Sequence, residues 1–555
     1  MKIKIDGKEV ECKKDETILS ICQRVGVKIP TLCYHKSLFP EARCRVCLVE
    51  MNGKFVTSCS TKPTKNANII TNSEKILKAR RLNLELVSSG INQNDLTDDF
   101  EAEKVYKEVG IKSNRFDSIK NYISDLGDAI IRDNNKCINC GRCVQVCGEI
   151  QKIFAIDFAS RAHNEHVTPY FEKNLSEVAC IKCGQCLINC PVGAISERPH
   201  LKEVIAALND KEKYVVAQTA PSIRATLGEL FGLEPGTLVT GKMISALRKC
   251  GFYKVFDVDL GADITIMEES AEFIKRINEN KNLPMITTCC PAWILMMEFF
   301  YHDLIDNMST CKSPHEMLGM LIKTYYAKKA GIDPKKIVVV SVMPCTAKKF
   351  ESTRKELNSG VDYVLTTREL GRLIKMKNID FNSLKEDKFD EILGEASGAG
   401  DIFGSAGGVM EAALRTVFEK YTGKRLKRVI FKSLRKNSGI KEGEIFLKGK
   451  KIKYVAVSGG ANIRKVIENK EKYHFIEMMA CPGGCVGGGG QPIYSDPNVL
   501  FKRAKALYKQ DSLKRYRRSH ENPIVKKIYE EYLGEPLSRR AEELLHTSYE
   551  KRNKF

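Results

Sequence analysis

Regularly spaced cysteines are the residues of this sequence best suited to chemistry. Two runs, "CINCGRCVQVC" and "CIKCGQCLINC", share the pattern C-x2-C-x2-C-x3-C at a period of 43 residues. A [4Fe–4S] cluster needs four thiolates, and in paired runs of this kind the fourth cysteine of each run ligates the other cluster. The runs therefore predict one cluster on Cys137, Cys140, Cys143 and Cys190, and a second on Cys180, Cys183, Cys186 and Cys147. Paired zinc sites are the alternative, which the repeat and the proline after Cys190 disfavour.

A separate group of cysteines lies near the N-terminus. Its members are Cys33, Cys44, Cys47 and Cys59, spaced C-x10-C-x2-C-x11-C. This spacing differs from the C-x4-C-x2-C start of plant ferredoxins, so on spacing alone both a [2Fe–2S] cluster and a zinc ion remain open. The neighbouring repeat favours [2Fe–2S], because a second redox centre would extend a path for electrons.

Four more cysteines are spread over three distant stretches. The stretches are "TTCCPAW", "MPCTAKKFE" and "MMACPGGCVGGGGQP", and they contribute Cys290, Cys345, Cys481 and Cys485. Scattered thiols are weak evidence by themselves, and a flexible turn is the alternative for the glycine-rich stretch. Glycines there would let the backbone approach another group closely. From the residues alone, we expect a buried fourth cluster.

The composition restricts the class of protein. The chain has 555 residues, 21 cysteines and a formal net charge of +21. The N-terminus lacks the apolar core of a signal peptide and no apolar stretch reaches membrane-spanning length, so we expect a cytoplasmic protein that does not bind membranes. In a reducing cytosol, many cysteines indicate metal binding or redox chemistry. The basic residues are dispersed, which favours docking of an acidic redox protein over binding of nucleic acid.

The elements that must position these residues divide the chain into four predicted domains. An alternating stretch that turns at Asp6-Gly7, followed by a helix that we expect Asp15 to cap, indicates a [2Fe–2S] ferredoxin-like β-grasp domain over residues 1–76. Residues 77–125 are a small helical connector, and residues 126–205 are the 2[4Fe–4S] ferredoxin-like domain. Residues 206–555 alternate β-rich runs with amphipathic helices, which predicts α/β and α+β multidomain architecture with a two-lobed C-terminal domain.

The three scattered stretches resemble the three motifs of the [FeFe]-hydrogenases, TSCCPxW, MPCxxKxxE and ExMACxxGCxxGGGQP. The resemblance extends through "IMEESAEF", "GAGDIFGSAGGVMEAALR" and "SHENPIVKKIYEEYLG", in the same order along the chain. It implies an H-cluster, which is a [4Fe–4S] cluster joined to a diiron unit with CO, cyanide and azadithiolate. It also implies that Cys290, Cys345 and Cys481 hold the [4Fe–4S] part and that Cys485 bridges to the diiron unit.

The resemblance assigns roles to further residues of the cavity. Lys348 would donate a hydrogen bond to one cyanide, and the segment Ala220, Pro221 and Ser222 would hold the other. Met343 and Met479 match methionines of the cofactor pocket, with core packing as the alternative. For Lys348 the alternative is a solvated surface lysine.

The resemblance also implies a proton path from Cys289 through Glu269, Ser309, Glu272 and Arg276 to solvent. The spacing of Glu269, Glu272 and Arg276 supports it, because i, i+3 and i+7 share one face of a helix. An ordinary solvated helix face is the alternative. Glu268 is expected to point elsewhere, without a role.

Some residues depart from the family pattern or stand outside it. Pro482, His315 and Cys311 occupy positions where histidine, glutamine and a small apolar residue are common in the family. The connector lacks the histidine and cysteines that bind an additional cluster in longer relatives. Cys12, Cys22, Cys250 and Cys311 are expected to be buried structural thiols.

Together these features predict a ferredoxin-type [FeFe]-hydrogenase that interconverts H2 with protons and electrons. Its expected cofactors are one [2Fe–2S] cluster, two [4Fe–4S] clusters and the H-cluster. Its expected partners are ferredoxin or a similar redox protein and the maturation proteins that deliver the diiron unit. The alternatives are a non-catalytic electron-transfer or iron–sulfur assembly protein of the same fold, and an H2 sensor.

Overall fold

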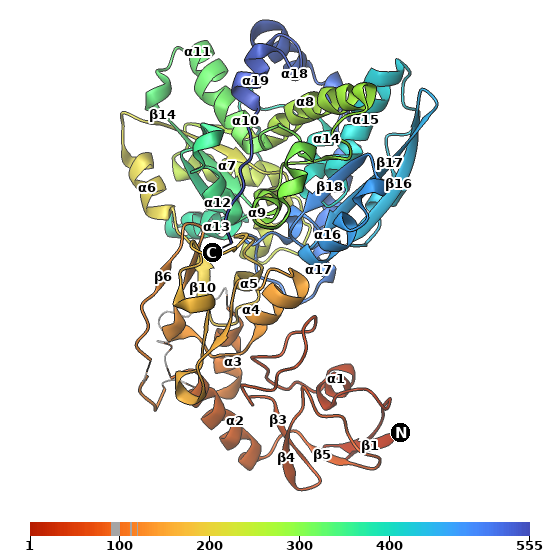
Figure 1. The fold of residues 1–555 in the computed structure, drawn as a ribbon. Helices are drawn as coiled ribbons and strands as arrows, with labels where there is room; N and C mark the ends of the chain where they lie inside the picture. The colour runs from red at the N-terminus through yellow and green to blue at the C-terminus, as the bar shows by residue number, and fades with distance from the viewer. Residues whose placement is uncertain (90, 92–99, 112–113, 119, 555) are drawn as a thin grey trace.

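The structure is a computed structural model that describes residues 1–554, except 90, 92–99, 112–113 and 119. A narrow N-terminal end, drawn in red and orange, leads into a broad C-terminal body (Figure 1). The C-terminus returns to the region where the two parts meet, so the chain ends far from where it starts.

The N-terminal end is a β-grasp fold. Its five-stranded sheet has the order β2-β1-β5-β3-β4, with β1 and β5 parallel and the other pairs antiparallel. The strands are β1 (Lys2–Ile5), β2 (Lys8–Glu11), β3 (Leu48–Met51), β4 (Lys54–Thr57) and β5 (Asn68–Ile70). The turn at Asp6 and Gly7 confirms the predicted hairpin. Helix α1 (Ile18–Arg24) is capped by Thr17 rather than Asp15, because the Thr17 side chain accepts a hydrogen bond from the Ser20 amide.

Two helices, α2 (Glu74–Val87) and α3 (Glu101–Val109), link this domain to the cysteine repeat. The repeat carries a matching pair of short helices, α4 (Arg142–Gln145) and α5 (Gln185–Ile188). Each begins after a glycine in the left-handed region, Gly141 with φ 79° and Gly184 with φ 70°. These turns bring successive cysteines of each run to one side. The associated strands are β6 (Asp125–Leu126), β7 (Ile130–Arg132), β8 (Asp157–Ala159), β9 (His166–Thr168) and β10 (Ile195–Glu197).

The body contains two four-stranded sheets, which confirms the two-lobed α/β architecture. The first sheet is fully parallel and has the order β12-β11-β14-β15. Its strands are β11 (Tyr214–Thr219), β12 (Lys254–Asp257), β14 (Ile337–Met343) and β15 (Tyr363–Thr366). The second sheet has the order β13-β18-β17-β16 with only β16 antiparallel to its neighbour. Its strands are β13 (Met285–Ile286), β16 (Ile440–Leu447), β17 (Lys450–Ser458) and β18 (Phe475–Met479).

Helices cover both sheets. Parallel strands carry apolar side chains on both faces, so both faces must be shielded from water. The longest helix, α8 (Val258–Glu279), packs against α10 (Pro314–Leu321), α14 (Gly398–Asp401) and α15 (Gly408–Thr422). Around them lie α6 (Leu201–Asn209), α7 (Thr240–Cys250), α9 (Pro291–Phe300), α11 (Ala327–Ala330), α12 (Ala347–Glu351), α13 (Thr367–Met376), α16 (Gly460–Ile467) and α17 (Asn498–Leu513). The last helices, α18 (Pro523–Ile528) and α19 (Arg539–Leu545), pack on α8 and α10 respectively.

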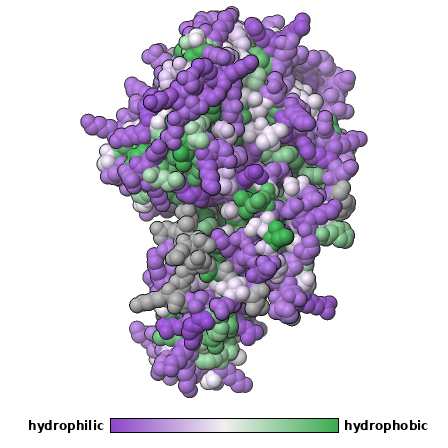
Figure 2. Space-filling model, turned by 90° about the vertical axis from the view of Figure 1, so that its left-hand side faces the viewer, coloured by the Kyte–Doolittle hydropathy of each residue, from purple (hydrophilic) through white to green (hydrophobic). Residues whose placement is uncertain are grey.

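Figure 2 shows one face on which apolar residues form small groups among hydrophilic ones. Among the residues that the structure describes, no helix combines the length and the apolar character needed to cross a bilayer. The domain boundaries at 76, 125 and 205 remain predictions.

Candidate active site

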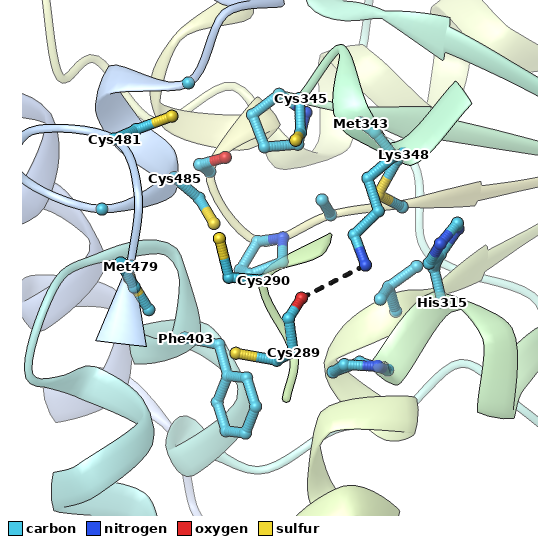
Figure 3. Close-up of a pocket in the computed structure, with 18 of the residues that line it drawn as sticks. Cys289, Cys290, His315, Met343, Cys345, Lys348, Phe403, Met479, Cys481 and Cys485 are labelled. Carbon is cyan, nitrogen blue, oxygen red and sulfur yellow. Dashed lines mark hydrogen bonds between the residues drawn. The ribbon is translucent and has the colours of Figure 1, made fainter. Parts of the chain in front are cut away.

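Three loops that follow parallel strands meet between the two sheets. The loop after β13 carries Cys289 and Cys290, the loop after β14 carries Cys345, and the loop after β18 carries Cys481 and Cys485. Because the carboxyl ends of parallel strands lie at one edge of a sheet, loops distant in sequence converge there. In Figure 3 the sulfurs of Cys290 and Cys485 point toward each other, with Cys345 and Cys481 beyond them.

These loops line a cavity of about 70 Å³ with a largely apolar lining. The predicted cavity residues all line it: Ala220, Pro221, Ser222, Cys289, Cys290, Met343, Cys345, Lys348, Met479, Cys481 and Cys485. Phe403, Val258 and Ala262 line it too and were not predicted. Phe403 lies in "GAGDIFGSAGG", whose resemblance to the family was the available signal.

The cysteines of the cavity suit a metal cluster. All 21 cysteines lie in the described part of the chain and none forms a disulfide. Burial, and then the neighbouring Cys290, raises the pKa of Cys345 to about 12, so a free thiolate would be unfavourable here. Iron compensates for such a cost, since coordinated thiolates are stabilised by the metal. Four of the five thiols that line this largely apolar cavity, Cys290, Cys345, Cys481 and Cys485, therefore fit a cluster with an attached group.

Lys348 supplies the positive charge of the cavity. Its Nζ donates to the backbone carbonyl of Cys289 at 3.3 Å and to Glu351 Oε2 at 2.6 Å. Burial alone would lower the pKa of Lys348, but the Glu351 carboxylate raises it. Lys348 is 8% exposed, so the interpretation as a solvated surface lysine is wrong.

The glycines of the third loop allow close packing of backbone on backbone. A Cβ on Gly489 would clash with the carbonyl oxygen of Cys183, and a Cβ on Gly488 would clash with that of Pro344. Of the glycines in this loop, only Gly484 and Gly488 also line the cavity. The expectation of close approach holds, but the groups approached are mainly other protein loops.

Helix α8 places the predicted acidic residues between the cavity and the surface. The Ser309 hydroxyl donates to Glu272 Oε2 at 2.8 Å, and Arg276 pairs with Glu272 Oε1 at 2.6 Å. Glu269, Glu272 and Arg276 are all buried, so the solvated helix face is wrong for these side chains. Their role in proton transfer remains a proposal.

Glu269 has the environment of a neutral, proton-holding group. Its carboxyl group is fully buried and neither of its oxygens has a hydrogen-bond partner within the described residues. Burial, together with the nearby charge of Glu272, raises the pKa of Glu269 to about 8. Burial, and then the neighbouring Glu269 carboxyl group, raise the pKa of the Cys289 thiol.

Glu268 also has a structural role, which the sequence did not suggest. Its carboxylate accepts from the hydroxyl of Tyr529 at 2.5 Å and from the amide of Leu537 at 2.8 Å, and its Oε2 lies 3.1 Å from His546 Nε2. It thus ties α8 to the C-terminal helices. Cys12, Cys22, Cys250 and Cys311 are buried, as expected of structural thiols.

The cysteines of the repeat form two groups that match the crossed assignment. Cys137, Cys140, Cys143 and Cys190 line one cavity of about 20 Å³. Burial, and then charges on Cys183, Cys180 and Cys147, raise the pKa of Cys186. Cys147 is therefore a neighbour of the second run rather than of its own.

The N-terminal cysteines touch the repeat through Arg142. Its Nε donates to the carbonyl of Cys33 at 3.2 Å, and its guanidinium pairs with Glu101 of α3 at 2.9 Å. Arg142 stands between Cys140 and Cys143 in sequence. Sequence reasoning missed this buried arginine, because nothing in its spacing distinguishes it from a surface residue.

At its other end, the repeat touches the cavity loops. Cys481 Sγ lies 3.8 Å from the carbonyl oxygen of Cys183, and Thr346 Oγ1 donates to the carbonyl of Lys182 at 2.7 Å. The N-terminal site, the two groups of the repeat and the cavity therefore follow one another in contact.

Four regions of the chain match known protein families. Residues 213–489 match the "Iron only hydrogenase large subunit, C-terminal domain" and residues 497–552 the "Iron hydrogenase small subunit". Residues 1–74 match a "2Fe-2S iron-sulfur cluster binding domain" and residues 136–194 a "4Fe-4S dicluster domain". Along the chain, these matches cover the N-terminal cysteine site, then the cysteine repeat, then the body that holds the cavity.

Individual relatives agree with these families. The chain is 43% identical to the NADP-reducing hydrogenase subunit HndD of Solidesulfovibrio fructosivorans, with 100% of this chain and 99% of that protein covered. It is 39% identical to iron hydrogenase 1 of Clostridium pasteurianum, with 99% of each covered. A solved structure of a variant of [FeFe]-hydrogenase HydA1 from Chlamydomonas reinhardtii has a TM-score of 0.58 at 40% identity and covers 63% of this chain and 99% of that one. The chain is therefore an iron-sulfur oxidoreductase that belongs to the [FeFe]-hydrogenase family.

Proposed function

We propose that the protein catalyses reversible oxidation of H2 and reduction of protons at an H-cluster, and exchanges electrons with ferredoxin or a similar redox protein. One observation carries this proposal. The four thiols, Cys289 and Lys348 line a single, largely apolar cavity, with the buried Glu269 beside Cys289 and a contact from Cys481 to Cys183 of the cysteine repeat.

The cavity offers a place for each part of the cofactor. Cys290, Cys345 and Cys481 would hold the [4Fe–4S] part, and Cys485 would bridge to the diiron unit. When bound, that unit supplies a Lewis-acidic iron and an amine base for the heterolytic splitting of H2. Maturation proteins would deliver it to the folded chain.

The remaining cavity residues position and shield the group. Lys348 would donate to one cyanide, which is anionic and would therefore strengthen the hydrogen bond. Ala220, Pro221 and Ser222, which also line the cavity, would hold the other cyanide. Met343 and Met479 fill the apolar wall with adaptable side chains that exclude water.

Protons pass between the cavity and solvent along α8. The Cys289 thiol exchanges its proton with Glu269. From there the path continues through Ser309, which donates a hydrogen bond to Glu272, and the Glu272–Arg276 pair meets the surface. Glu269 suits the middle of this path because its raised pKa, about 8, lets it take up and release a proton near neutral pH.

Electrons pass between the cavity and the N-terminal site through the contacts of the cysteine repeat. The [2Fe–2S] site on Cys33, Cys44, Cys47 and Cys59 touches the first repeat cluster through Arg142, and the second repeat cluster touches the cavity through Cys183. The order is therefore [2Fe–2S], first [4Fe–4S], second [4Fe–4S], H-cluster. Iron would total about 16 per chain, counted as two, four, four and six from the cluster types.

The proposal extends to the electron partner and to the cellular compartment. We propose a cytoplasmic enzyme with an acidic partner such as ferredoxin, because the formal net charge of the chain is +21. The relative named as a subunit of an NADP-reducing hydrogenase provides the competing proposal, a partner subunit that links H2 to NADP. Reduction of purified ferredoxin by H2, without any added subunit, distinguishes the two.

The test is an infrared spectrum of the protein after maturation, combined with an assay of H2 turnover. Bands from CO and cyanide, accompanied by turnover in both directions, are expected. The competing function is iron–sulfur assembly, because the chain is 30% identical over 67% of its length to cytosolic iron-sulfur assembly component 3 of Bos taurus. Full occupancy of the iron–sulfur sites without CO and cyanide bands would support that function and contradict ours.

A further inference from the structure

A buried chain of hydrogen bonds runs from the first sheet to the cavity wall, and its centre is His315. Gln218 of β11 donates to Ser341 Oγ of β14 at 2.5 Å. The Ser341 hydroxyl lies 3.2 Å from His315 Nδ1, and His315 Nε2 lies 2.6 Å from Glu351 Oε2. The same carboxylate oxygen accepts from Lys348 Nζ at 2.6 Å.

The direction of each hydrogen bond in this chain follows from its neighbours. Ser341 Oγ already accepts from Gln218, so its own hydrogen is available to His315 Nδ1. Nδ1 is then the acceptor and Nε2 carries the hydrogen that is donated to Glu351. The chain thereby selects one tautomer of a neutral imidazole.

The charges agree with this assignment. Burial, and then the Lys348 ammonium, lower the pKa of His315 to about 4. Burial opposes ionisation of Glu351, but Lys348 and His315 lower its pKa to about 2. A neutral histidine thus lies between a serine and a Glu351–Lys348 ion pair. The ammonium supplies the positive charge that a metal ion would otherwise bring to His315, Glu316 and Glu351, so the cluster needs no cation.

Two hydrogen bonds hold the Lys348 ammonium and leave its third hydrogen available. A lysine ammonium has three hydrogens. Two of them go to Glu351 Oε2 and the Cys289 carbonyl, and the side chain lines the cavity. In Figure 3 His315 lies beside the end of the Lys348 side chain, and a dashed line joins the Lys348 ammonium to the Cys289 carbonyl oxygen.

We propose that His315 is a positioning residue, which fixes the Glu351 carboxylate and, through it, aims the third hydrogen of Lys348 into the cavity. This inference rests on the proposed function, in which that hydrogen meets a cyanide ligand. An imidazole suits the task because its two nitrogens reach opposite partners across a rigid ring. Glutamine, which often occupies this position in the family, carries both polar atoms at one end.

The experiment compares infrared spectra, iron content and turnover of matured variants. In His315→Ala and in the more conservative His315→Gln, the cyanide bands should shift, turnover should fall by about tenfold, and iron content should stay at the parent value. Ser341→Ala removes only the partner of Nδ1, so a smaller shift in the same direction is expected. His315→Gln keeps much of the side-chain volume, so it carries the test if the alanine variant does not fold.

A matched control exists elsewhere in the chain. Like His315, His520 lies between a hydroxyl and a carboxylate. Thr416 Oγ1 is 3.2 Å from its Nδ1 and Glu419 Oε2 is 3.0 Å from its Nε2, but His520 does not line the cavity. His520→Ala should leave the cyanide bands at the parent positions. Parent-like bands and turnover in both His315 variants, or equal shifts in His520→Ala, would overturn the inference. A matured parent without CO and cyanide bands would instead contradict the proposed function.

Discussion

Each of the two groups of the cysteine repeat and the cavity of the body bring four predicted ligand thiols together, yet they do so by different means. In the repeat, short runs and two left-handed glycines bring the cysteines together, and three of the four predicted ligands of each site lie close in sequence. In the body, the thiols come from loops after β13, β14 and β18, and two sheets must form before they meet. Local spacing therefore encodes the electron-transfer sites, whereas the fold encodes the cavity.

This difference sets what could be predicted from the sequence. The spacing of the repeat predicts even the crossing of Cys147 and Cys190 between sites, which the neighbourhoods of these thiols match. The cavity residues were predicted only through resemblance, because no rule of spacing joins residues so far apart in sequence. Hairpins and helices were predicted, whereas a cap such as Thr17 in place of Asp15 depends on local geometry.

Buried polar contacts were the hardest to predict. Glu268 and Glu269 are adjacent and identical in chemistry, but one anchors the C-terminal helices while the other lacks hydrogen-bond partners among the described residues. Arg142 and the Gln218–Ser341–His315 chain depend on which surfaces pack together. Those surfaces are decided by tertiary structure rather than by local pattern.

The largest expected effect separates the two kinds of site. Cys485→Ala should abolish CO and cyanide bands and reduce H2 turnover to background, because it removes the bridge to the diiron unit. Cys143→Ala removes a ligand of the repeat and should leave those bands in place while electron transfer to ferredoxin fails. Infrared spectra and ferredoxin reduction measure the two effects. Loss of the bands in both variants would show that the cavity is not independent of the repeat.

Cys289→Ala should lower turnover by about 10²-fold or more while the infrared bands persist. The side chain lines the cavity but is not a predicted ligand, so only proton transfer should fail. Cys289→Ser should recover little activity, since a hydroxyl is a weaker acid than a thiol. Parent-like turnover in the alanine variant would mean that protons use another route.

Glu269→Gln should lower turnover by about 10- to 100-fold with intact clusters, and its stability should depend on pH. The folded pKa of about 8 lies above the ordinary value of 4.5, so the unfolded chain releases a proton that the folded protein keeps. Parent stability therefore falls as pH rises from about 4.5 to about 8, and glutamine removes this loss. Melting curves should show the variant more stable than the parent at pH 8, with the difference vanishing near pH 4.5.

Glu268→Gln is the matched control on the same helix and should behave in the opposite way. The Glu268 carboxylate accepts hydrogen bonds from Tyr529 and Leu537, so its neutral replacement should destabilise the protein by about 1–3 kcal/mol at neutral pH. Turnover per folded molecule should stay near the parent value. Equal effects of the two substitutions on stability at pH 8 would contradict the different environments assigned to these neighbours.

The smallest expected effect concerns thiols outside both kinds of site. Cys12 and Cys22 are buried in the core of the β-grasp domain, and the segment between Cys59 and Cys137 contains neither cysteine nor histidine. Replacing both thiols with alanine should leave iron at about 16 per chain, counted from the cluster types. Iron near 20 in the parent, falling by about four in the double variant, would reveal an additional cluster.

The most direct test of the whole account is whether H2 reduces the N-terminal cluster through the chain of contacts. Matured protein under H2 should show the paramagnetic resonance signal of a reduced [2Fe–2S] cluster, and Cys289→Ala should show it only slowly. This result requires catalysis in the cavity and conduction through both repeat clusters to Arg142 and Cys33. Turnover with an artificial dye but no reduction of the N-terminal cluster by H2 would contradict the account.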